Sequence, residues 1–277
     1  MATQTQTLTT TGPVSATTAA FVPTVSLWWR EVVRFYRNRG RVAGVILSPL
    51  LFWLVIGSGF GTSFNGGPTG GGSHYLEYFF PGALTMIVLF TSIFAMMSVI
   101  EDRKEGFLLS VLVAPVHRSV IVMGKVLGGT TLAAMQGLVF LAFTPLLRGA
   151  HLGFDNILPL IAAVLLVSFS LTALGFAIAW PMDSTQAFHA IVNLFLIPLW
   201  LLSGALFPLS GASGWIRVLM RINPLTYGNE AIRQLLFPGT ASVLPVASSL
   251  MVLALFSAAM FAWAFLMANR RTTRPAA

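Results

Sequence analysis

The sequence predicts an all-α integral membrane protein with six transmembrane helices. Three observations lead to this fold class: 56% of the 277 residues are hydrophobic, only 9% are charged, and the charges form short clusters between long apolar stretches. An average soluble domain has about 25% charged residues, so water is a poor solvent for most of this chain. The formal net charge of +8 would also fit a nucleic-acid-binding protein, but the clustering of the charges favours a membrane protein.

Six apolar stretches are each long enough to cross a bilayer, whose hydrocarbon core of roughly 30 Å needs about 20 residues of helix. The predicted spans are residues 42–60, 80–100, 126–147, 157–181, 189–208 and 243–268. Pro198 lies inside the fifth span and predicts a kink in it. Small residues spaced by four, such as Gly124 and Gly128, indicate close approach of another helix and are consistent with dimerisation.

The two ends of the chain lie outside these spans. Residues 1–22 lack the basic region and apolar core of a signal peptide and are predicted to form a disordered tail. Residues 24–268 are assigned to one transmembrane domain, and residues 269–277 to a short basic tail. The chain contains no cysteine, which excludes disulfides and thiolate metal sites within it.

The distribution of Lys and Arg predicts the orientation in the membrane. Twelve basic residues fall on the side of the two termini, which also includes the segment between the second and third spans, and four fall on the other side. Cytoplasmic loops carry the excess of positive charge. We therefore expect a multi-pass protein of the inner or plasma membrane, with both termini in the cytoplasm.

Residues 26–41 are predicted to form an amphipathic helix in the cytoplasmic membrane interface. Apolar side chains recur with helical spacing on one stripe, and arginines follow a second stripe about 100° round the helix. Aromatic and arginine side chains beside such a stripe suit the headgroup region. The residues assigned to the interface are Trp28, Trp29, Arg30, Arg34, Tyr36 and Arg37. A basic juxtamembrane segment that only sets topology is the alternative interpretation.

A charged run leaves the second span as Glu101-Asp102-Arg103-Lys104-Glu105-Gly106. Each charge would cost on the order of 2.5–3.5 kcal/mol at the bilayer centre, so the run is expected in water. The apolar stretch 107–113 that follows is too short to span a bilayer, and Pro115 stops it. A short apolar helix on the cytoplasmic side needs a partner surface, either lipid headgroups or another protein. An ordinary cytoplasmic loop is the alternative.

Two short helices are predicted between the fifth and sixth spans, on the extracytoplasmic side. The first has one apolar face, formed by Trp215, Val218, Leu219 and Ile222. The second begins at Pro224 and is capped by Asn223. Glu230 and Arg233 are spaced to form an exposed ion pair worth about a few tenths of a kcal/mol. The two helices either form a re-entrant hairpin or lie flat on the outer leaflet.

Five short motifs follow one another along the chain: Tyr78-Phe79-Phe80-Pro81-Gly82, the charged run at 101–106, Val113-Ala114-Pro115-Val116-His117-Arg118, Ser203-Gly204-Ala205-Leu206-Phe207-Pro208 and Asn223-Pro224-Leu225-Thr226-Tyr227. With these motifs and six spans, the chain resembles the ABC type-2 transporter permease family. That family includes drug exporters and exporters of lipid-linked glycans, and the likeness is nearest to its daunorubicin-exporter-like branch. Each motif is unspecific by itself, but together they cover roughly residues 24–268.

The resemblance implies a non-catalytic half of an exporter. Two six-span subunits, as a homodimer or a heterodimer, would form the pathway, and separate ABC ATPase subunits would bind ATP and Mg. The substrate would be apolar or amphipathic: a drug or antibiotic, a lipid or a lipid-linked glycan. The residues then assigned to ATPase coupling are Glu101, Asp102, Arg103, Lys104, Glu105, Gly106, Phe107, Leu108, Leu109, Leu112 and Pro115. Those assigned to an extracytoplasmic gate are Ser203, Gly204, Phe207, Pro208, Asn223, Pro224, Tyr227 and Glu230.

Other function classes fit the sequence less well. Gly124-Lys125 is followed by Val126 where a phosphate-binding loop needs Ser or Thr. The spans are expected to hold essentially no ionisable residues, which disfavours an ion-coupled secondary transporter, the main alternative. The four histidines are scattered along the chain and form no metal-binding spacing, so neither an enzyme nor a metal site is expected.

Overall fold

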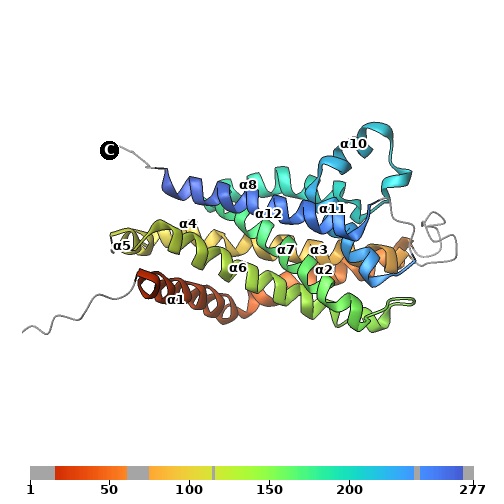
Figure 1. The fold of residues 1–277 in the computed structure, drawn as a ribbon, viewed down its shortest axis with the longest axis horizontal. Coiled ribbons are helices and arrows are strands. Elements are labelled where there is room, and N and C mark those ends of the chain that lie inside the picture. Colours follow the sequence, from red (N-terminus) through yellow and green to blue (C-terminus); the bar gives the residue numbers. More distant parts are fainter. Residues whose placement is uncertain (1–15, 61–74, 114–115, 240–243, 271–277) are drawn as a thin grey trace, which may run out of the picture.

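The computed structural model describes residues 16–60, 75–113, 116–239 and 244–270, and these residues form helices and connecting turns with no strand among them. Most of the helices run along the long axis of the molecule (Figure 1). They are α1 (Ala16–Arg37), α2 (Arg39–Phe60), α3 (Tyr75–Ala95), α4 (Met97–Lys104), α5 (Phe107–Val113), α6 (Arg118–Leu141), η2 (Thr144–Leu146), α7 (Phe154–Ala179), α8 (Thr185–Ile191), η3 (Val192–Leu196), α9 (Ile197–Trp200), η4 (Leu201–Ala205), η5 (Leu209–Gly211), α10 (Gly214–Ile222), α11 (Pro224–Leu236) and α12 (Val246–Asn269).

Six helical stretches in the described part of the chain are long and apolar enough to cross a membrane. They are Val42–Phe60, Tyr75–Lys104, Arg118–Leu146, Phe154–Ala179, Thr185–Ala205 and Val246–Asn269. This result confirms the predicted all-α membrane fold with six spans. The second span is longer than predicted, because α4 carries it through part of the charged run to Lys104.

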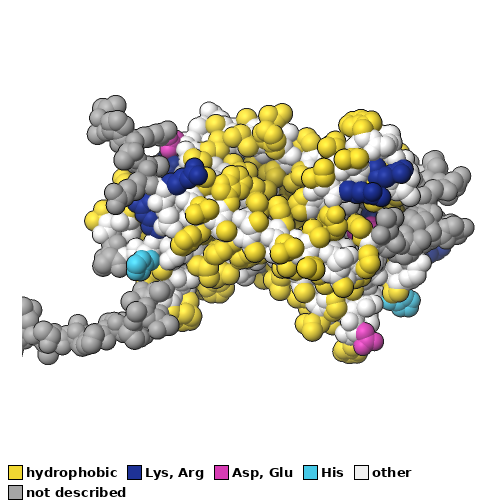
Figure 2. Space-filling view, turned by 45° about the horizontal axis from the view of Figure 1, so that its top comes forward, with side chains coloured by type: hydrophobic (Ala, Val, Ile, Leu, Met, Phe, Trp, Pro, Cys, Tyr) yellow, Lys and Arg dark blue, Asp and Glu magenta, His cyan; other side chains and the backbone are white. Residues whose placement is uncertain are grey.

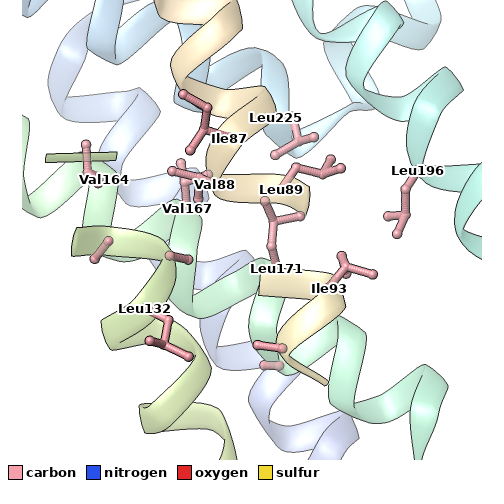
Figure 3. Packing of buried hydrophobic residues seen from close by; sticks show 14 of the residues in the cluster. Ile87, Val88, Leu89, Ile93, Leu132, Val164, Val167, Leu171, Leu196 and Leu225 are labelled. Atoms are coloured by element: carbon pink, nitrogen blue, oxygen red, sulfur yellow. The ribbon is translucent and has the colours of Figure 1, made fainter. Parts of the chain in front are cut away.

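The second span lies at the centre of the bundle. In its apolar stretch 78% of the residues are buried, against 19% in the first span and 17% in the sixth. Val88 and Leu89 of α3 are fully buried and lie beside Val167 and Leu171 of α7 in the core (Figure 3). The first and sixth spans are peripheral, so their apolar faces are open to lipid or to another subunit.

Charged side chains gather near the two ends of the bundle. Figure 2 shows Lys and Arg near both ends and mostly hydrophobic side chains on the surface between them. One end holds α5, the start of α1 and the end of α12, and the other holds α10 (Figure 1). We call these the α5 end and the α10 end. The first and last described residues both lie at the α5 end, as an even number of spans requires.

Two predictions for the N-terminal region are corrected by the structure. α1 begins at Ala16, so residues 16–22 are helical and do not belong to a disordered tail. The predicted helix over 26–41 is divided, because α1 ends at Arg37 and α2 begins at Arg39. The rest of the predicted tails, residues 1–15 and 271–277, lie outside the described residues.

Candidate functional site

Charged side chains from α1, α4 and α6 meet at the α5 end. Asp102, near the end of the second span, is fully buried. Its carboxylate accepts hydrogen bonds from Arg30 at 2.7 and 2.9 Å and from Arg34 at 2.7 Å, and Lys125 donates to it as well. The prediction that the whole charged run lies in water is therefore wrong at Asp102, where protein donors replace water.

Lys125 extends these contacts to the inner face of α1. Its side chain is only 1% exposed, and its Nζ donates to Glu31 Oε1 at 2.6 Å and to Ser98 Oγ at 3.0 Å. Arg34 donates to Glu101 at 2.9 Å. Buried charges are tolerated when they are paired in this way, and removal of one partner leaves the other uncompensated. We define the charge cluster as Arg30, Glu31, Arg34, Glu101, Asp102 and Lys125.

Two glycines of α6 let α1 approach closely enough to complete the charge cluster. A Cβ atom added at Gly124 would lie 2.7 Å from Leu27 Cβ, and one added at Gly128 would lie 2.8 Å from Glu31 Cβ. Both distances are shorter than side-chain carbons tolerate, so larger residues would push α1 away. The two glycines contact a helix of the same chain, and their spacing therefore gives no support to dimerisation.

The prediction for α1 is corrected at its arginines. Arg30 and Arg34 were expected to reach the lipid headgroups, but they point into the charge cluster. The hydrogen bonds with Asp102 raise the pKa of Arg30 above its ordinary value. Trp28 is half-buried and donates to Thr131 Oγ1 at 3.0 Å.

The outer face of α1 keeps the predicted apolar stripe. It borders a shallow groove of about 510 Å³ lined by Trp29, Val32, Val33, Tyr36 and Arg37. Trp29 and Tyr36 are both exposed, as amphipathic aromatics in a membrane interface would be before lipid covers them. The location of this face in a membrane interface stays a prediction.

α5 presents a small apolar surface at the tip of the α5 end. Leu109 and Val113 are 63% and 86% exposed, and their i, i+4 spacing places them on one face of the helix. Leu108, by contrast, is buried. The ring of Phe107 packs against the guanidinium of Arg30, 3.7 Å from its centroid. α5 is thus joined to the charge cluster on one side and free on the other.

The residues predicted to couple to an ATPase differ in accessibility. The exposed ones are Lys104, Glu105 and Leu109. Those of intermediate exposure are Glu101, Arg103, Gly106, Phe107 and Leu112. Asp102 and Leu108 are buried, so they cannot contact a partner directly, and Pro115 lies outside the described residues. Val113, which the prediction omitted, is accessible.

The fifth span loses its regular helical form toward the α10 end. It passes from α8 through the π-helical η3, the short α9 and the π-helical η4. Within η4, Gly204 has a φ of +77°, a left-handed conformation that glycine adopts at no steric cost. The sequence predicted a kink at Pro198, but the sharpest departure lies six residues later. We define the helix break as residues 199–206.

Side chains of α3 and α11 donate to the carbonyl groups of the helix break. Gly204 O accepts hydrogen bonds from Tyr78 Oη and from Arg233 Nη2, each at 2.9 Å. Further donors come from α11 and its N-cap residue: Asn223 to Leu199 O at 2.6 Å, Asn229 to Ser203 O at 3.2 Å and Thr226 to Leu202 O at 3.3 Å. Irregular backbone at membrane depth must be satisfied by protein or water, and here protein side chains satisfy it.

The predicted gate residues lie in or next to this helix break. Ser203 and Gly204 belong to it, and Phe207 and Pro208 follow it and are half-buried. The predicted cap of α11 is confirmed: Asn223 Oδ1 accepts from the Leu225 amide at 3.0 Å, and Pro224 is at the first position of the helix. Tyr227 Oη donates to Arg221 O at 2.8 Å.

Other residues at the helix break were missed or misjudged from the sequence. Glu230 and Arg233 pair at 3.0 Å as predicted, but Arg233 is buried, so the pair is not the exposed one expected. Asn229 was not predicted as a site residue. The spacing of Thr226, Asn229 and Arg233 by three and four marked one polar face of α11, which was the available signal.

The two helices between the fifth and sixth spans differ in their surroundings. α11 packs inside the bundle, where a Cβ added at Gly228 would lie 2.8 Å from Val167 Cγ2 of α7. α10 projects from the bundle (Figure 1), and its predicted apolar face of Trp215, Val218, Leu219 and Ile222 is exposed. Whether the two helices form a re-entrant hairpin or lie flat on the outer leaflet stays a prediction.

The expectation that the spans hold essentially no ionisable residues also needs correction. Asp102 and Lys125 are buried within the second and third spans, and Arg233 is buried beside the fifth. Each of the three has a partner of opposite charge in the structure. Their charges are therefore compensated by the protein itself.

Comparison with known proteins points to one family and several relatives. Residues 23–237, more than half of the chain, match the family described as ABC-2 type transporter. A transport permease of Cyanophora paradoxa, ycf38, is 29% identical over an alignment of 197 residues, and the match covers 68% of this chain and 65% of that protein. The chain therefore spans just under two thirds of that relative's length.

Two further relatives carry transport names. The daunorubicin resistance ABC transporter permease protein DrrB1 of Streptomyces coeruleorubidus is 23% identical over 240 residues, covering 86% of this chain and 83% of that protein. YbhR of Escherichia coli (strain K12), named as a multidrug ABC transporter permease, is 26% identical over 163 residues, covering 58% of this chain and 44% of that protein.

Proposed function

This chain belongs to the ABC-2 type transporter family and is a membrane permease subunit of an ABC transporter, and we propose that it works in export, driven by ATP that a separate ATPase chain hydrolyses. Two copies of it, or one copy and a similar permease, form the pathway. The α5 end faces the cytoplasm and the α10 end faces outward, in keeping with the excess of basic residues on the side of the termini.

The single observation that carries the coupling part of this proposal is the apolar tip of α5. Leu109 and Val113 lie beyond the second span, next to the charged residues that close it. Apolar side chains in water are stabilised by a partner that covers them. The charge cluster joins this tip to α1 and α6, so a protein docked on α5 is connected to the bundle through buried ion pairs.

A separate source of ATP hydrolysis is supported by the surroundings of the Gly124-Lys125 pair. In nucleotide-binding loops the lysine reaches phosphate oxygens. Here Lys125 is buried and donates to Glu31, Ser98 and Asp102, and Gly124 lies against α1. This pair therefore serves helix packing, and its lysine is not available to a phosphate.

An apolar or amphipathic substrate is supported by composition and by relatives. The chain holds 22 Phe and 11 Met among 277 residues and few charges, so a pathway built from it offers dispersion contacts more than ion pairs. One relative is named for daunorubicin resistance and another as a multidrug permease. We propose that this chain also exports a drug-like or lipid-like molecule through the region around the helix break.

Co-purification tests the proposed ATPase partner. A tagged chain is isolated in mild detergent from its native membranes, and the co-purifying ATP hydrolysis is measured for the wild type, Leu109→Asp and the control Leu146→Asp. Leu146 is also an exposed leucine, 72% accessible. It lies in η2, which follows the end of α6 that is farther from α5. We expect wild-type hydrolysis with Leu146→Asp and a loss of at least about tenfold with Leu109→Asp, since a buried unpaired carboxylate is costly at an interface.

The same experiment has clear contrary outcomes. If Leu109→Asp retained as much ATP hydrolysis as the control Leu146→Asp and the wild type, the apolar tip of α5 would not be the docking surface. The chain can also be reconstituted alone in vesicles. Uptake of a fluorescent lipophilic cation driven by a proton or sodium gradient would then show an ion-coupled secondary transporter and contradict the proposal.

A further inference from the structure

The connection between the second and third spans contacts the ends of two other spans. It does so through two arginines, Arg103 near the end of α4 and Arg118 at the start of α6. The last carbonyl groups of any helix lack partners within that helix and favour a positive charge near them. Arg103 and Arg118 each supply such a partner, but to different helices.

Arg103 lies against the end of the fourth span. Its Nη1 donates to Met182 O at 2.8 Å, its Nη2 donates to Trp180 O, and it pairs with Asp183 at 3.1 Å. α7 ends at Ala179, so these acceptors form the turn that leads from the fourth span into the fifth. A planar guanidinium can bind several acceptors at once in fixed geometry, which the single ammonium of lysine does not reproduce.

Arg118 lies against the end of the sixth span. Its Nη1 donates to Ala268 O at 2.9 Å and to Arg270 O at 3.4 Å. α12 ends at Asn269, so Ala268 belongs to its last turn and Arg270 is the residue that caps its end. The ends of the fourth and sixth spans are thus bound by one connection, on whose accessible side lies the apolar tip of α5.

The two bound spans are themselves packed against each other and against α11. Ser257 Oγ of α12 donates to Leu166 O of α7 at 3.1 Å, and the rings of Phe169 and Phe261 are 5.5 Å apart. α11 contacts α7 closely at Gly228 and also holds the helix break. A continuous set of contacts therefore runs from the α5 end to the helix break at the α10 end.

We propose that Arg103 and Arg118 are positioning residues that carry movement of the connection between the second and third spans to the ends of the fourth and sixth spans. This proposal rests on the proposed function, because the movement comes from the docked ATPase. Movement of the connection displaces α7 and α12 together through the two guanidinium groups, and α11 and the helix break follow. Spatial continuity alone does not establish coupling, so the test must measure a response at the far end.

The absence of cysteine in the sequence allows that response to be measured at one introduced site. Ser213→Cys places a thiol at the exposed start of α10. Its labelling rate by a water-soluble maleimide is measured in the complex with its ATPase, without nucleotide and after trapping with ATP, Mg²⁺ and vanadate. The Arg103→Lys/Arg118→Lys variant and the control Arg148→Lys, an exposed arginine on the α10 side of α6, are made in this background.

We expect the parent and Arg148→Lys to change their labelling rate on trapping. In the double lysine variant that change is expected to fall at least fivefold, because Lys keeps the charge but loses the planar guanidinium. ATP hydrolysis is expected to stay within about twofold of the parent, because both guanidinium groups face the ends of α7 and α12 and not the apolar tip of α5; for Arg103 this corrects its predicted assignment to direct ATPase contact. A purely structural role would lower assembly and hydrolysis together. An undiminished change in the double variant would overturn the proposal.

Two further outcomes also decide the proposal. If the double variant does not assemble with the ATPase, Arg103→Lys and Arg118→Lys are measured singly. A reduced change in labelling rate in either single variant, with ATP hydrolysis retained, supports the proposal. A full change in both single variants, or a reduced change that occurs only together with loss of ATP hydrolysis, overturns it. If the parent itself shows no ATP hydrolysis, the proposed function fails. If the parent hydrolyses ATP and the lysine variant shows the same change in labelling rate as the parent, only the role of the two arginines fails.

Discussion

The two ends of the bundle bury polar groups by different means. At the α5 end the charge cluster joins three helices through bonds between ionised side chains, with Asp102 and Lys125 at its centre. At the α10 end mostly neutral side chains of α11 donate to backbone carbonyls of the helix break, as Asn229 does to Ser203. One arrangement holds separate helices together, and the other stabilises an irregular stretch within one span.

The difference has a consequence for how each end can change. A buried ion pair tolerates little separation, because an uncompensated charge in a low-dielectric surrounding is costly. A neutral hydrogen bond to a carbonyl costs less to break and can be replaced by water. We therefore expect the α5 end to move as a unit and the α10 end to rearrange internally. Four substitutions test this contrast, from the largest expected effect to the smallest.

Replacement of Lys125 should give the largest loss of stability. Lys125→Met leaves the buried Glu31 and Asp102 with one cation fewer, and we expect the free energy of unfolding to fall by about 3–5 kcal/mol. The measurement is SDS-induced unfolding in mixed micelles. Lys104→Met, at an exposed position, is the matched control and should change stability by less than about 0.5 kcal/mol. Equal effects of the two substitutions would contradict the charge cluster.

A smaller loss is expected when Asn229 is changed to Ala. The side chain donates to Ser203 O at 3.2 Å and to Ser203 Oγ at 2.7 Å, and it accepts from Thr85. Leaving these neutral groups without a partner should cost about 1–3 kcal/mol in the same unfolding assay. Asn156→Ala, at the start of α7, serves as the control. A loss as large as that of Lys125→Met would remove the contrast between the two ends.

Gly204→Ala probes the backbone of the helix break itself. A side chain at a φ of +77° should cost about 1–2 kcal/mol, and refolding of the last turn into a regular helix would deprive Tyr78 and Arg233 of their shared acceptor. Gly44→Ala is the control, because an added Cβ there meets nothing within 4 Å and alanine favours the helix. Thermal unfolding in detergent distinguishes the pair, and equal midpoints would mean that the left-handed conformation is not required.

The smallest effect is expected for Glu230→Gln. This removes the carboxylate paired with Arg233 at 3.0 Å, but Arg233 keeps Gly204 O and the ring of Tyr78, whose centroid lies 4.2 Å away. We expect a loss of at most about 1 kcal/mol, because the Glu230 side chain is 19% exposed and glutamine keeps an oxygen that can accept from Arg233. Asp155→Asn, at an exposed position on the same side, is the comparison. A loss of several kcal/mol would mean that both ends depend on buried charge.

Much of the fold followed from the sequence because the bilayer leaves few choices. A helix must supply about 20 apolar residues to satisfy its own backbone inside lipid, so the six spans were recognisable without any partner. The cap of α11 was equally local, since Asn223 and Pro224 act on the helix that follows them. Predictions of this kind depend on neighbours in sequence and were confirmed.

The candidate sites were less accessible to prediction because they depend on neighbours in space. The run at 101–106 carries charges of both signs that look solvated, and only the approach of α1 to Gly124 and Gly128 shows that Asp102 is enclosed. Arg30 and Arg34 of α1 gave the same false impression of contact with lipid headgroups. Leu108 and Leu109 are chemically identical neighbours, and packing alone decides that the first is buried and the second exposed.

The sequence by itself determined a six-span helical membrane protein, because hydrophobic length and charge clustering are properties of a single segment in contact with its solvent. Only the tertiary structure decided which charges are buried, which side chains support the helix break at Gly204, and which arginines bind the ends of other spans. Those outcomes depend on side chains far apart in the chain. Pairing energy between such groups arises only once packing has excluded water from between them.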